Sequence, residues 1–233
     1  MKRDIAQISA CIETYETFIQ PYQDACQVVS MWLENMQKEF GKEYNHNPVH
    51  SIQKRIKSLN SIADKLSRKG YEVNLDNAMA YLTDIAGVRV ICYYIQDVYV
   101  IAGILKNQPD TVLIKETDYI KNPKPNGYRS YHMVLGITLH QVKGKQYFPV
   151  EIQIRTLAMD FWASMEHQLC YKTERTDIVS LSGELTYYAD MLHEMERRIS
   201  VFYDCNIPVP AAETAIDSNP KVPALSGKAE KRG

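Results

Sequence analysis

A block of short runs rich in β-branched and aromatic residues, between two stretches of helical periodicity, most constrains how this chain can fold. Four such runs lie in the middle of the chain: GVRVICYYI (87–95), TVLIKETDYI (111–120), YHMVLGITLH (131–140) and QYFPVEIQI (146–154). Runs of this kind are typical of strands, and the linker QVKGK between the last two predicts a hairpin with Gly144 in its turn. We therefore expect an α+β fold with a small mixed sheet of four to five strands, flanked by helices.

Apolar residues recur every three or four positions on both sides of this block, which is typical of amphipathic helices. The spacing predicts helices over 4–40, with a new apolar run after Pro21, and over 49–69, where Gly70 ends the helix. Further helices are expected over 97–107, 156–172 and 178–204. The expected domains are an N-terminal helical extension (1–44), a catalytic domain (45–175), a C-terminal helix (176–206) and a disordered tail (207–233).

Composition excludes some classes of protein. The 27 Lys and Arg residues nearly balance 28 Asp and Glu residues, so a generally basic surface for nucleic acid is not encoded. The five cysteines include no CxxC pair, which argues against a disulfide framework or a structural zinc site. No apolar run reaches the roughly 18 residues of a membrane span, and the first residues lack the apolar core of a secretory signal. We expect a cytoplasmic protein that binds neither membrane nor DNA.

Two carboxylates occupy unusual places for a buried sheet. Asp84 directly precedes the run 87–95, and Glu151 lies within an otherwise apolar strand. Because side chains alternate along a strand, Glu151, Gln153 and Arg155 share one face. That face is either an exposed sheet surface with scattered charges or the lining of a polar cleft. In a cleft, the two carboxylates would suit Mg²⁺ held together with substrate phosphates.

The loop KNPKPNGYRSYH (121–132) collects cationic and aromatic side chains. Lys124, Arg129 and His132 lie close to the ring of Tyr128, and Gly127 permits the close approach of a ligand. This set suits an anionic ligand with a ring, such as a nucleotide, although a basic surface loop is an equally simple interpretation. Neither a GxxxxGK phosphate loop nor a GxGxxG motif is present.

The expected helix 49–69 has a basic excess. Between Lys54 and Lys69 there are six basic residues and only one acidic residue, Asp64. Such a face could reach a triphosphate if the helix borders the cleft, but most charge runs are solvated helix faces. The sequence contains no HExxH, no His-Asp pair and no GxSxG, so hydrolases built on those motifs are not encoded.

Three segments together resemble the synthetase domain of the RelA/SpoT family, and most of all its small alarmone synthetases. They are DIAGVRV (84–90), KPNGYRSYH (124–132) and VEIQIRTLAMDFWASMEH (150–167), and the resemblance extends over about 45–205. It implies a nucleotidyltransferase-like domain. It also implies an enzyme that transfers pyrophosphate from ATP to the 3′-hydroxyl of GDP or GTP, giving (p)ppGpp and AMP.

The resemblance also implies roles for single residues. Asp84 and Glu151 would be the catalytic pair and would bind Mg²⁺, with Glu151 also able to act as general base. ATP would contact Arg55, Lys57, Ser61, Lys65 and Arg89. The acceptor nucleotide would contact Lys124, Tyr128, Arg129, His132, Gln153 and Asp160. The chain departs from the family at Asp160, where some members have Asn, and at Ser58, where Pro is frequent.

Two other functions remain open in this sequence. A branch of the family consists of toxins that pyrophosphorylate the 3′ CCA end of tRNA and are neutralised by an antitoxin, and the same motifs serve both activities. The few basic residues in the first 40 positions favour a nucleotide acceptor over tRNA. A silent binding module is the third interpretation, and the intact Asp84, Tyr128 and Glu151 argue against it. The resemblance further implies a homo-oligomer, a tetramer built through the terminal helices.

Overall fold

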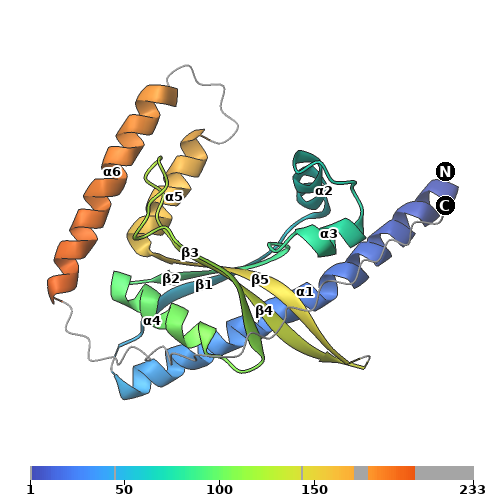
Figure 1. The fold of residues 1–233 in the computed structure, drawn as a ribbon, viewed down its shortest axis with the longest axis horizontal. Helices are drawn as coiled ribbons and strands as arrows, with labels where there is room; N and C mark the ends of the chain where they lie inside the picture. Colours follow the sequence, from blue (N-terminus) through green and yellow to red (C-terminus); the bar gives the residue numbers. More distant parts are fainter. Residues whose placement is uncertain (1, 45, 143, 171–177, 203–233) are drawn as a thin grey trace, which may run out of the picture.

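The computed structural model describes residues 2–44, 46–142, 144–170 and 178–202, and the expected tail 207–233 lies outside them. Figure 1 shows helices on both sides of one sheet. The elements in chain order are α1 (Lys2–Glu43), β1 (Val49–Ile56), α2 (Leu59–Arg68), α3 (Leu75–Tyr81), β2 (Ala86–Cys92), α4 (Ile95–Lys106), β3 (Thr111–Asp118), β4 (Tyr131–Gln141), β5 (Gly144–Thr156), α5 (Leu157–Cys170), α6 (Ile178–Ile199) and a 3₁₀ turn (Ser200–Phe202).

The sheet has five strands in the order β1-β2-β5-β4-β3, which confirms the expected α+β fold with a small mixed sheet. The central pair β2–β5 is parallel and the other three pairs are antiparallel, with β4 and β5 forming the expected hairpin. Paired residues on neighbouring strands point to the same face. The register therefore places Arg55, Gly87 and Glu151 in one row across the sheet, and Gln53, Arg89, Gln153 and His132 in the next row.

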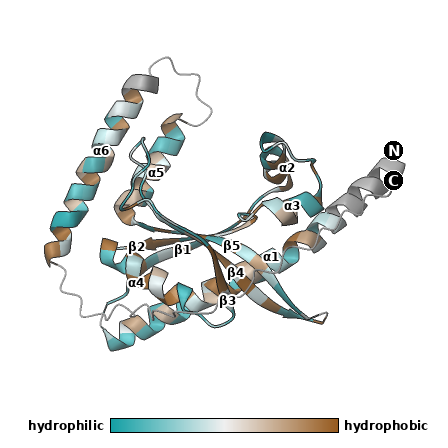
Figure 2. Cartoon of the chain, viewed as in Figure 1, coloured by the Kyte–Doolittle hydropathy of each residue, from teal (hydrophilic) through white to brown (hydrophobic). Residues whose placement is uncertain are grey.

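One face of the sheet carries the main hydrophobic core. In Figure 1, α1 and α4 lie below the sheet, while α2 with α3 and α5 with α6 rise above it at opposite ends. Alternate strand residues such as Val90, Ile152 and Leu135 are fully buried and pack in one cluster with residues of α1 and α4. Figure 2 shows this centre in brown, the colour of apolar residues. The opposite face is thereby left for polar side chains.

Helix α1 contributes a continuous apolar stripe to that core. Tyr22, Val29, Leu33, Met36 and Phe40 are buried at intervals of three, four or seven residues, as expected for one face of a helix. The helix passes through Pro21 without ending. Among the described residues, no helix is long and apolar enough to cross a membrane.

The expected helix over 49–69 is wrong in its first half. Residues Val49–Ile56 form β1, which pairs with β2 from Ile56↔Ala86 to Val49↔Cys92, and only the second half is helical. The apolar pair Ile52 and Ile56 fits a helical turn, but backbone pairing with a buried strand outweighs such spacing. Edge strands often carry charged residues, as β1 does with Lys54 and Arg55.

Helices α2 and α3 begin and end at recognisable capping residues. Ser58 is the N-cap of α2 and accepts a hydrogen bond from the amide of Ser61. After α2, Gly70 has φ = 76°, which confirms that the helix stops there. The short α3 was not expected from the sequence, and Asn74 caps it by accepting from Asn77 N at 2.7 Å.

Helices α5 and α6 pack against each other in a second, smaller core. Trp162, Leu185 and Ala189 are buried there, and Trp162 Nε1 donates to the Leu185 carbonyl at 2.7 Å. The helix expected over 178–204 ends at Ile199 and continues as the 3₁₀ turn, while 203–204 lie outside the described residues. This helix pair closes one end of the open sheet face.

Candidate active site

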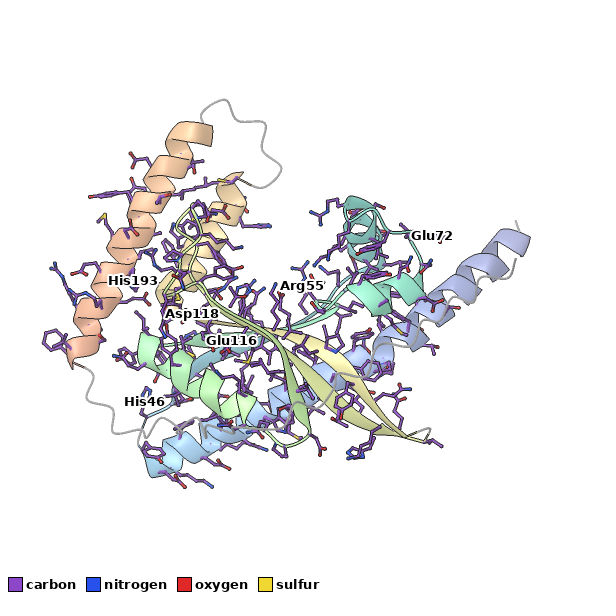
Figure 3. The ribbon with its side chains drawn as sticks, in the orientation of Figure 1. His46, Arg55, Glu72, Glu116, Asp118 and His193 are labelled. Atoms are coloured by element: carbon purple, nitrogen blue, oxygen red, sulfur yellow. The ribbon has the colours of Figure 1, made fainter. Side chains whose placement is uncertain are left out.

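A polar cleft of about 510 Å³ lies over the face of the sheet that the core leaves free. Its lining comes from β1, β2, β5 and the segments that lead into β2 and α2. In Figure 3, Arg55 lies over the sheet between α2 and α5. Glu151 and Gln153 therefore line a polar cleft, and their face of β5 is not an ordinary exposed sheet surface. The lining residues are Gln53, Lys54, Arg55, Lys57, Asp84, Gly87, Val88, Arg89, Glu151 and Gln153.

The floor of the cleft is open because Gly87 has no side chain. Gly87 pairs with Arg55 on one side and with Glu151 on the other, so it separates these two side chains in the same row. A larger residue at this position would project between a cation and a carboxylate. The sequence therefore places the smallest residue where a ligand can approach the sheet most closely.

Asp84 is held by two lysines at the entrance to β2. Its Oδ2 accepts from Lys65 Nζ at 2.6 Å and lies 3.0 Å from Lys57 Nζ. Burial alone would raise the pKa of Asp84, but hydrogen bonds and charge from Lys65 and Lys57 outweigh it and lower the pKa. The buried Oδ1 has no hydrogen-bond partner among the described residues. Asp84 is thus ionised and keeps one oxygen for a further ligand.

Glu151 has a different neighbourhood on β5. Its Oε2 accepts from Gln153 Nε2 at 3.1 Å, so a neutral amide orients this carboxylate. Asp84 and Glu151 both line the cleft, as the sequence analysis expected for a polar site. The described residues contain no cluster of three or more His, Cys, Asp or Glu that could bind a metal unaided. This donor set suits a cation that takes one or two carboxylates and completes its shell with phosphates and water.

Several residues that the resemblance assigns to the acceptor gather around Tyr128. Its hydroxyl lies 2.8 Å from His132 Nε2 and accepts from Arg155 Nη2 at 2.7 Å. The ammonium of Lys124 lies 4.6 Å from the centre of the Tyr128 ring and 4.9 Å from that of Tyr119. These are cation–π distances, so the ring surface is electron-rich and holds a cation in the structure.

His132 is neutral over the whole physiological range. Burial is the largest cause, and the charges of Arg155, Lys124 and Lys115 add to it, lowering the pKa of His132 to about 3. A neutral imidazole can still exchange a hydrogen bond with the Tyr128 hydroxyl. His132 therefore contacts the Tyr128 hydroxyl without adding to the positive charge of the loop.

Three more residues assigned from the sequence lie on or against the helices α2, α5 and α6. Arg129 donates to the Gly127 carbonyl at 3.1 Å and to Asp190 on α6 at 2.8 Å, so it faces α6. Ser61 lies in the first turn of α2, where its hydroxyl is 2.9 Å from that of Ser58. Asp160 lies in the first turn of α5 and lies between the guanidinium groups of Arg89 and Arg155.

The structure adds residues to the site that were not expected from the sequence. Gln53 and Lys54 line the cleft because β1 is a strand. The helix expected over 49–69 gave no reason to place them there. Arg155 was placed on the polar face of β5 but given no role. Its neighbours Glu151 and Gln153 on that face were the available signal.

Comparison with known proteins agrees with this geometry. The model of the region found in RelA / SpoT proteins matches residues 54–176. The GTP pyrophosphokinase YwaC of Bacillus subtilis is 35% identical over 192 residues, which cover 82% of this chain and 91% of that protein. The GTP pyrophosphokinase YjbM of the same organism is 37% identical over 158 residues, covering 68% and 74%.

Solved structures give the same result. The small alarmone synthetase 1 of Bacillus subtilis, bound to its product pppGpp, superposes with a TM-score of 0.73 at 32% identity, covering 82% of this chain and 96% of that one. A GTP pyrophosphokinase family protein of Streptococcus pneumoniae has a TM-score of 0.73 at 34% identity, covering 82% and 93%. The sequence relative and the solved structure each cover 82% of this chain, and this chain therefore belongs to the RelA/SpoT family, among its small alarmone synthetases.

Proposed function

We propose that this chain is a GTP pyrophosphokinase that transfers the β,γ-pyrophosphate of ATP to the 3′-hydroxyl of GDP or GTP. The observation that carries the proposal is the cleft in which Asp84, with its two lysines, and Glu151 line the same space. The relatives named above, and the product pppGpp bound to one of them, support the same reaction class.

The reaction needs positioning and charge neutralisation more than covalent help from the protein. The 3′-oxygen of the acceptor attacks the β-phosphorus of ATP, the bond between that phosphorus and the α,β-bridging oxygen breaks, and AMP leaves. The cations nearest to Asp84 are Lys57 and Lys65, and we assign them to the donor phosphates. Arg55 and Arg89, which line the same cleft from β1 and β2, are assigned to the adenine.

Glu151 is the residue that we assign to the attacking hydroxyl. It accepts the proton that the 3′-hydroxyl loses as the new oxygen–phosphorus bond forms. Gln153 orients the carboxylate through its 3.1 Å hydrogen bond. Asp84 is unsuited to this role because its ion pairs with two lysines lower its pKa.

Mg²⁺ is the cofactor that we propose, held by Asp84 and Glu151. The buried Oδ1 of Asp84, which has no partner among the described residues, fits this role. When bound, the ion would neutralise charge on the phosphate oxygens and orient them. The lysines beside Asp84 add to that neutralisation from the protein itself.

The guanine of the acceptor stacks on Tyr128 in this proposal. The Lys124 ammonium now lies 4.6 Å from the centre of this ring. A base that takes the place of the ammonium frees Lys124 for the acceptor phosphates. The same movement thus allows the guanine to stack on Tyr128 and Lys124 to contact the phosphates. His132 and Arg155 hold the tyrosine hydroxyl meanwhile.

A transfer assay with three separate acceptors tests the proposal. The protein is incubated with Mg²⁺ and γ-³²P-ATP, together with GDP, GTP or deacylated tRNA. Label in guanosine tetra- or pentaphosphate is the expected result. Label at the 3′ end of tRNA alone would instead identify a translation toxin and would contradict the proposed acceptor. No transfer to any of them would contradict the proposed enzymatic activity.

A further inference from the structure

Asp160 lies between two arginines that belong to different parts of the site. Its Oδ1 is 3.2 Å from Arg155 Nη1 and 3.4 Å from Arg89 Nη1. Charge-assisted hydrogen bonds between arginine and carboxylate are typically about 2.7–2.9 Å long. One oxygen is therefore shared between two cations, and neither pair reaches its best distance.

Arg155 connects Asp160 to the acceptor side. This arginine is buried, with 5% of its surface exposed. Its Nη2 donates to the Tyr128 hydroxyl at 2.7 Å and to Gln153 Oε1 at 3.0 Å, and its guanidinium carbon lies 5.1 Å from the centre of the Tyr128 ring. The position of the guanidinium therefore sets the position of the Tyr128 ring and of the amide that orients Glu151.

Arg89 connects Asp160 to the donor side. It lines the cleft from β2, and its side chain is 35% exposed, so it can move toward a ligand. Its Nε is buried and has no hydrogen-bond partner among the described residues. Burial and the nearby positive charge of Arg155 both lower the pKa of Arg89, because like charges repel.

We infer that Asp160 is a positioning residue that couples the donor and acceptor subsites through the contacts Arg89–Asp160–Arg155–Tyr128. The inference rests on the proposed function, in which Arg89 belongs to the ATP subsite and Tyr128 to the guanine subsite. When ATP engages Arg89, the shared Oδ1 is released to Arg155, and a shorter Asp160–Arg155 pair fixes Tyr128. ATP and the guanine nucleotide therefore bind with positive cooperativity.

This role depends on the negative charge of Asp160. An amide of the same shape can accept hydrogen bonds from both arginines, but it carries no charge and cannot neutralise the two guanidinium groups. With the charge removed, Arg89 and Arg155 repel each other whether or not ATP is bound. ATP binding can then no longer shift Asp160 from a shared contact to a closer pair with Arg155, so the coupling is lost. Each nucleotide can still reach its own subsite.

Calorimetric titration of the full chain tests the inference. The dissociation constant of GDP is measured with and without α,β-methylene-ATP, whose α,β bridge cannot be cleaved in the transfer. In the wild type, GDP affinity rises about fivefold or more with the analogue, and the analogue gains the same factor from GDP because coupling is reciprocal. In Asp160→Asn this factor falls to about one.

Further variants separate the role of the charge from simple loss of structure. Asp160→Glu keeps the charge and retains part of the coupling. Tyr128→Phe removes only the hydroxyl that Arg155 contacts, and it weakens the coupling while leaving binding of the ATP analogue unchanged. The matched control is Glu194→Gln on α6, where one carboxylate also accepts from two arginines, Arg197 and Arg198, outside the cleft. Its coupling factor equals that of the wild type.

The outcomes distinguish this inference from the proposed function. If GDP binds, guanosine product forms and the coupling factor is the same in Asp160→Asn as in the wild type, the inference is wrong and the proposed function stands. Independent binding of the two nucleotides to the wild type would also overturn the inference alone. If the wild type neither binds GDP nor makes guanosine product, the proposed function fails and the inference fails with it.

Discussion

At the scale of single residues, the two carboxylates of the cleft differ in their partners. Asp84 is held by the ammonium groups of Lys57 and Lys65, whereas Glu151 is held by the neutral amide of Gln153. A carboxylate between two cations is a poor proton acceptor, because protonation would break both ion pairs. In the proposed reaction, this difference favours Asp84 for charge binding and Glu151 for proton transfer.

Glu151→Gln tests that assignment directly. The variant should lower the turnover of pyrophosphate transfer by roughly 10²–10⁴-fold, because the amide cannot take a proton from the 3′-hydroxyl. Binding of ATP, measured by calorimetry, should change little. The control is Glu116→Gln on β3, whose carboxylate pairs with Lys106 at 2.8 Å, and its turnover should equal that of the wild type. Normal turnover in Glu151→Gln would remove the assigned role.

The neutral His132 makes stability depend on pH. Its pKa is about 3 in the folded state, mainly because of burial, against about 6.5 in an unfolded chain. Between these values only the unfolded state binds the proton, so stability falls as pH falls, by at most about 1.4 kcal/mol per pH unit. Urea unfolding of the ligand-free protein at pH 7.5, 6 and 5 measures this.

The comparison needs a variant because Glu196 acts in the opposite direction. Burial raises the pKa of Glu196 to about 7, so this group stabilises the fold as pH falls from 7 to 4.5. The difference between the wild type and His132→Gln isolates the histidine. The variant should gain stability relative to the wild type as pH falls below 6.5. Equal pH slopes would show that the pKa of His132 is the same in the folded and unfolded states and would contradict the lowered value.

Residues of the candidate site could be predicted from the sequence where they lie in a motif. Their contacts were less predictable where the partners come from distant elements. Asp84, Glu151 and Tyr128 could be assigned from DIAGVRV, VEIQIRT and GYRSYH. The orientation of Arg129 could not, because its partner Asp190 lies 61 positions later on α6. The contact of Arg155 with Tyr128 likewise joins residues that lie 27 positions apart in the chain.

At the scale of elements, the strand β1 shows what local spacing cannot predict. Ile52, Ile56, Leu59 and Leu66 have the intervals of one amphipathic helix, yet the chain changes from strand to helix between Ile56 and Leu59. The signal for that change was Ser58, which caps α2 and ends the extended segment. The buried strands, the β4–β5 hairpin and the helix α4 were predictable because their patterns admit few alternatives.

Substitutions at two glycines test how closely the loop 121–132 packs against α6. A Cβ on Gly127, which has φ = 90°, would lie 2.7 Å from Ala189 Cβ and 3.2 Å from Thr186 Cα. Gly127→Ala should therefore lower the free energy of unfolding by about 1–3 kcal/mol and weaken GDP binding, because the loop that carries Tyr128 must move. Urea unfolding and calorimetry measure the two effects.

The matched change on α6 has the opposite sign. Gly183 lies within the helix, and a Cβ there meets no atom within 4 Å. Gly183→Ala should raise the free energy of unfolding by about 0.5–1 kcal/mol, because alanine loses less backbone entropy in a helix. Equal effects of the two changes would contradict a close contact between Gly127 and α6.

At the scale of the whole molecule, α1 and the sheet share one core. The division of the chain at residue 44 stays a prediction of the sequence, and in the structure Tyr22, Leu33 and Phe40 of α1 pack with strand residues. Cys26 is buried on the same helix, and its Sγ lies 3.6 Å from the carbonyl oxygen of Gly87. The helix below the sheet therefore supports the strand that forms the floor of the cleft.

Association into a homo-oligomer remains our expectation for the molecule in solution. Tyr187, Met191, Met195 and Ile199 follow one another at intervals of four residues on α6 and are each 45–61% exposed, so they form an apolar stripe. Light scattering should give a mass above that of the monomer, and a tetramer is the expected species. Met191→Glu combined with Met195→Glu should lower it, while Met31→Glu on α1, also exposed, should not. A monomeric wild type would contradict the expectation.

The parallel pairing of β2 with β5 has a consequence for the order of synthesis and folding. Ala86 pairs with Val150 and Cys92 with Thr156, so the two central strands are separated by about sixty residues of chain. Contacts this distant close late, since a long loop must be ordered first. A nascent chain that ends before Glu151 has emerged holds the lysines, Asp84 and Tyr128 but cannot complete the cleft. The proposed active site is thus incomplete on the ribosome until β5 has been inserted between β2 and β4.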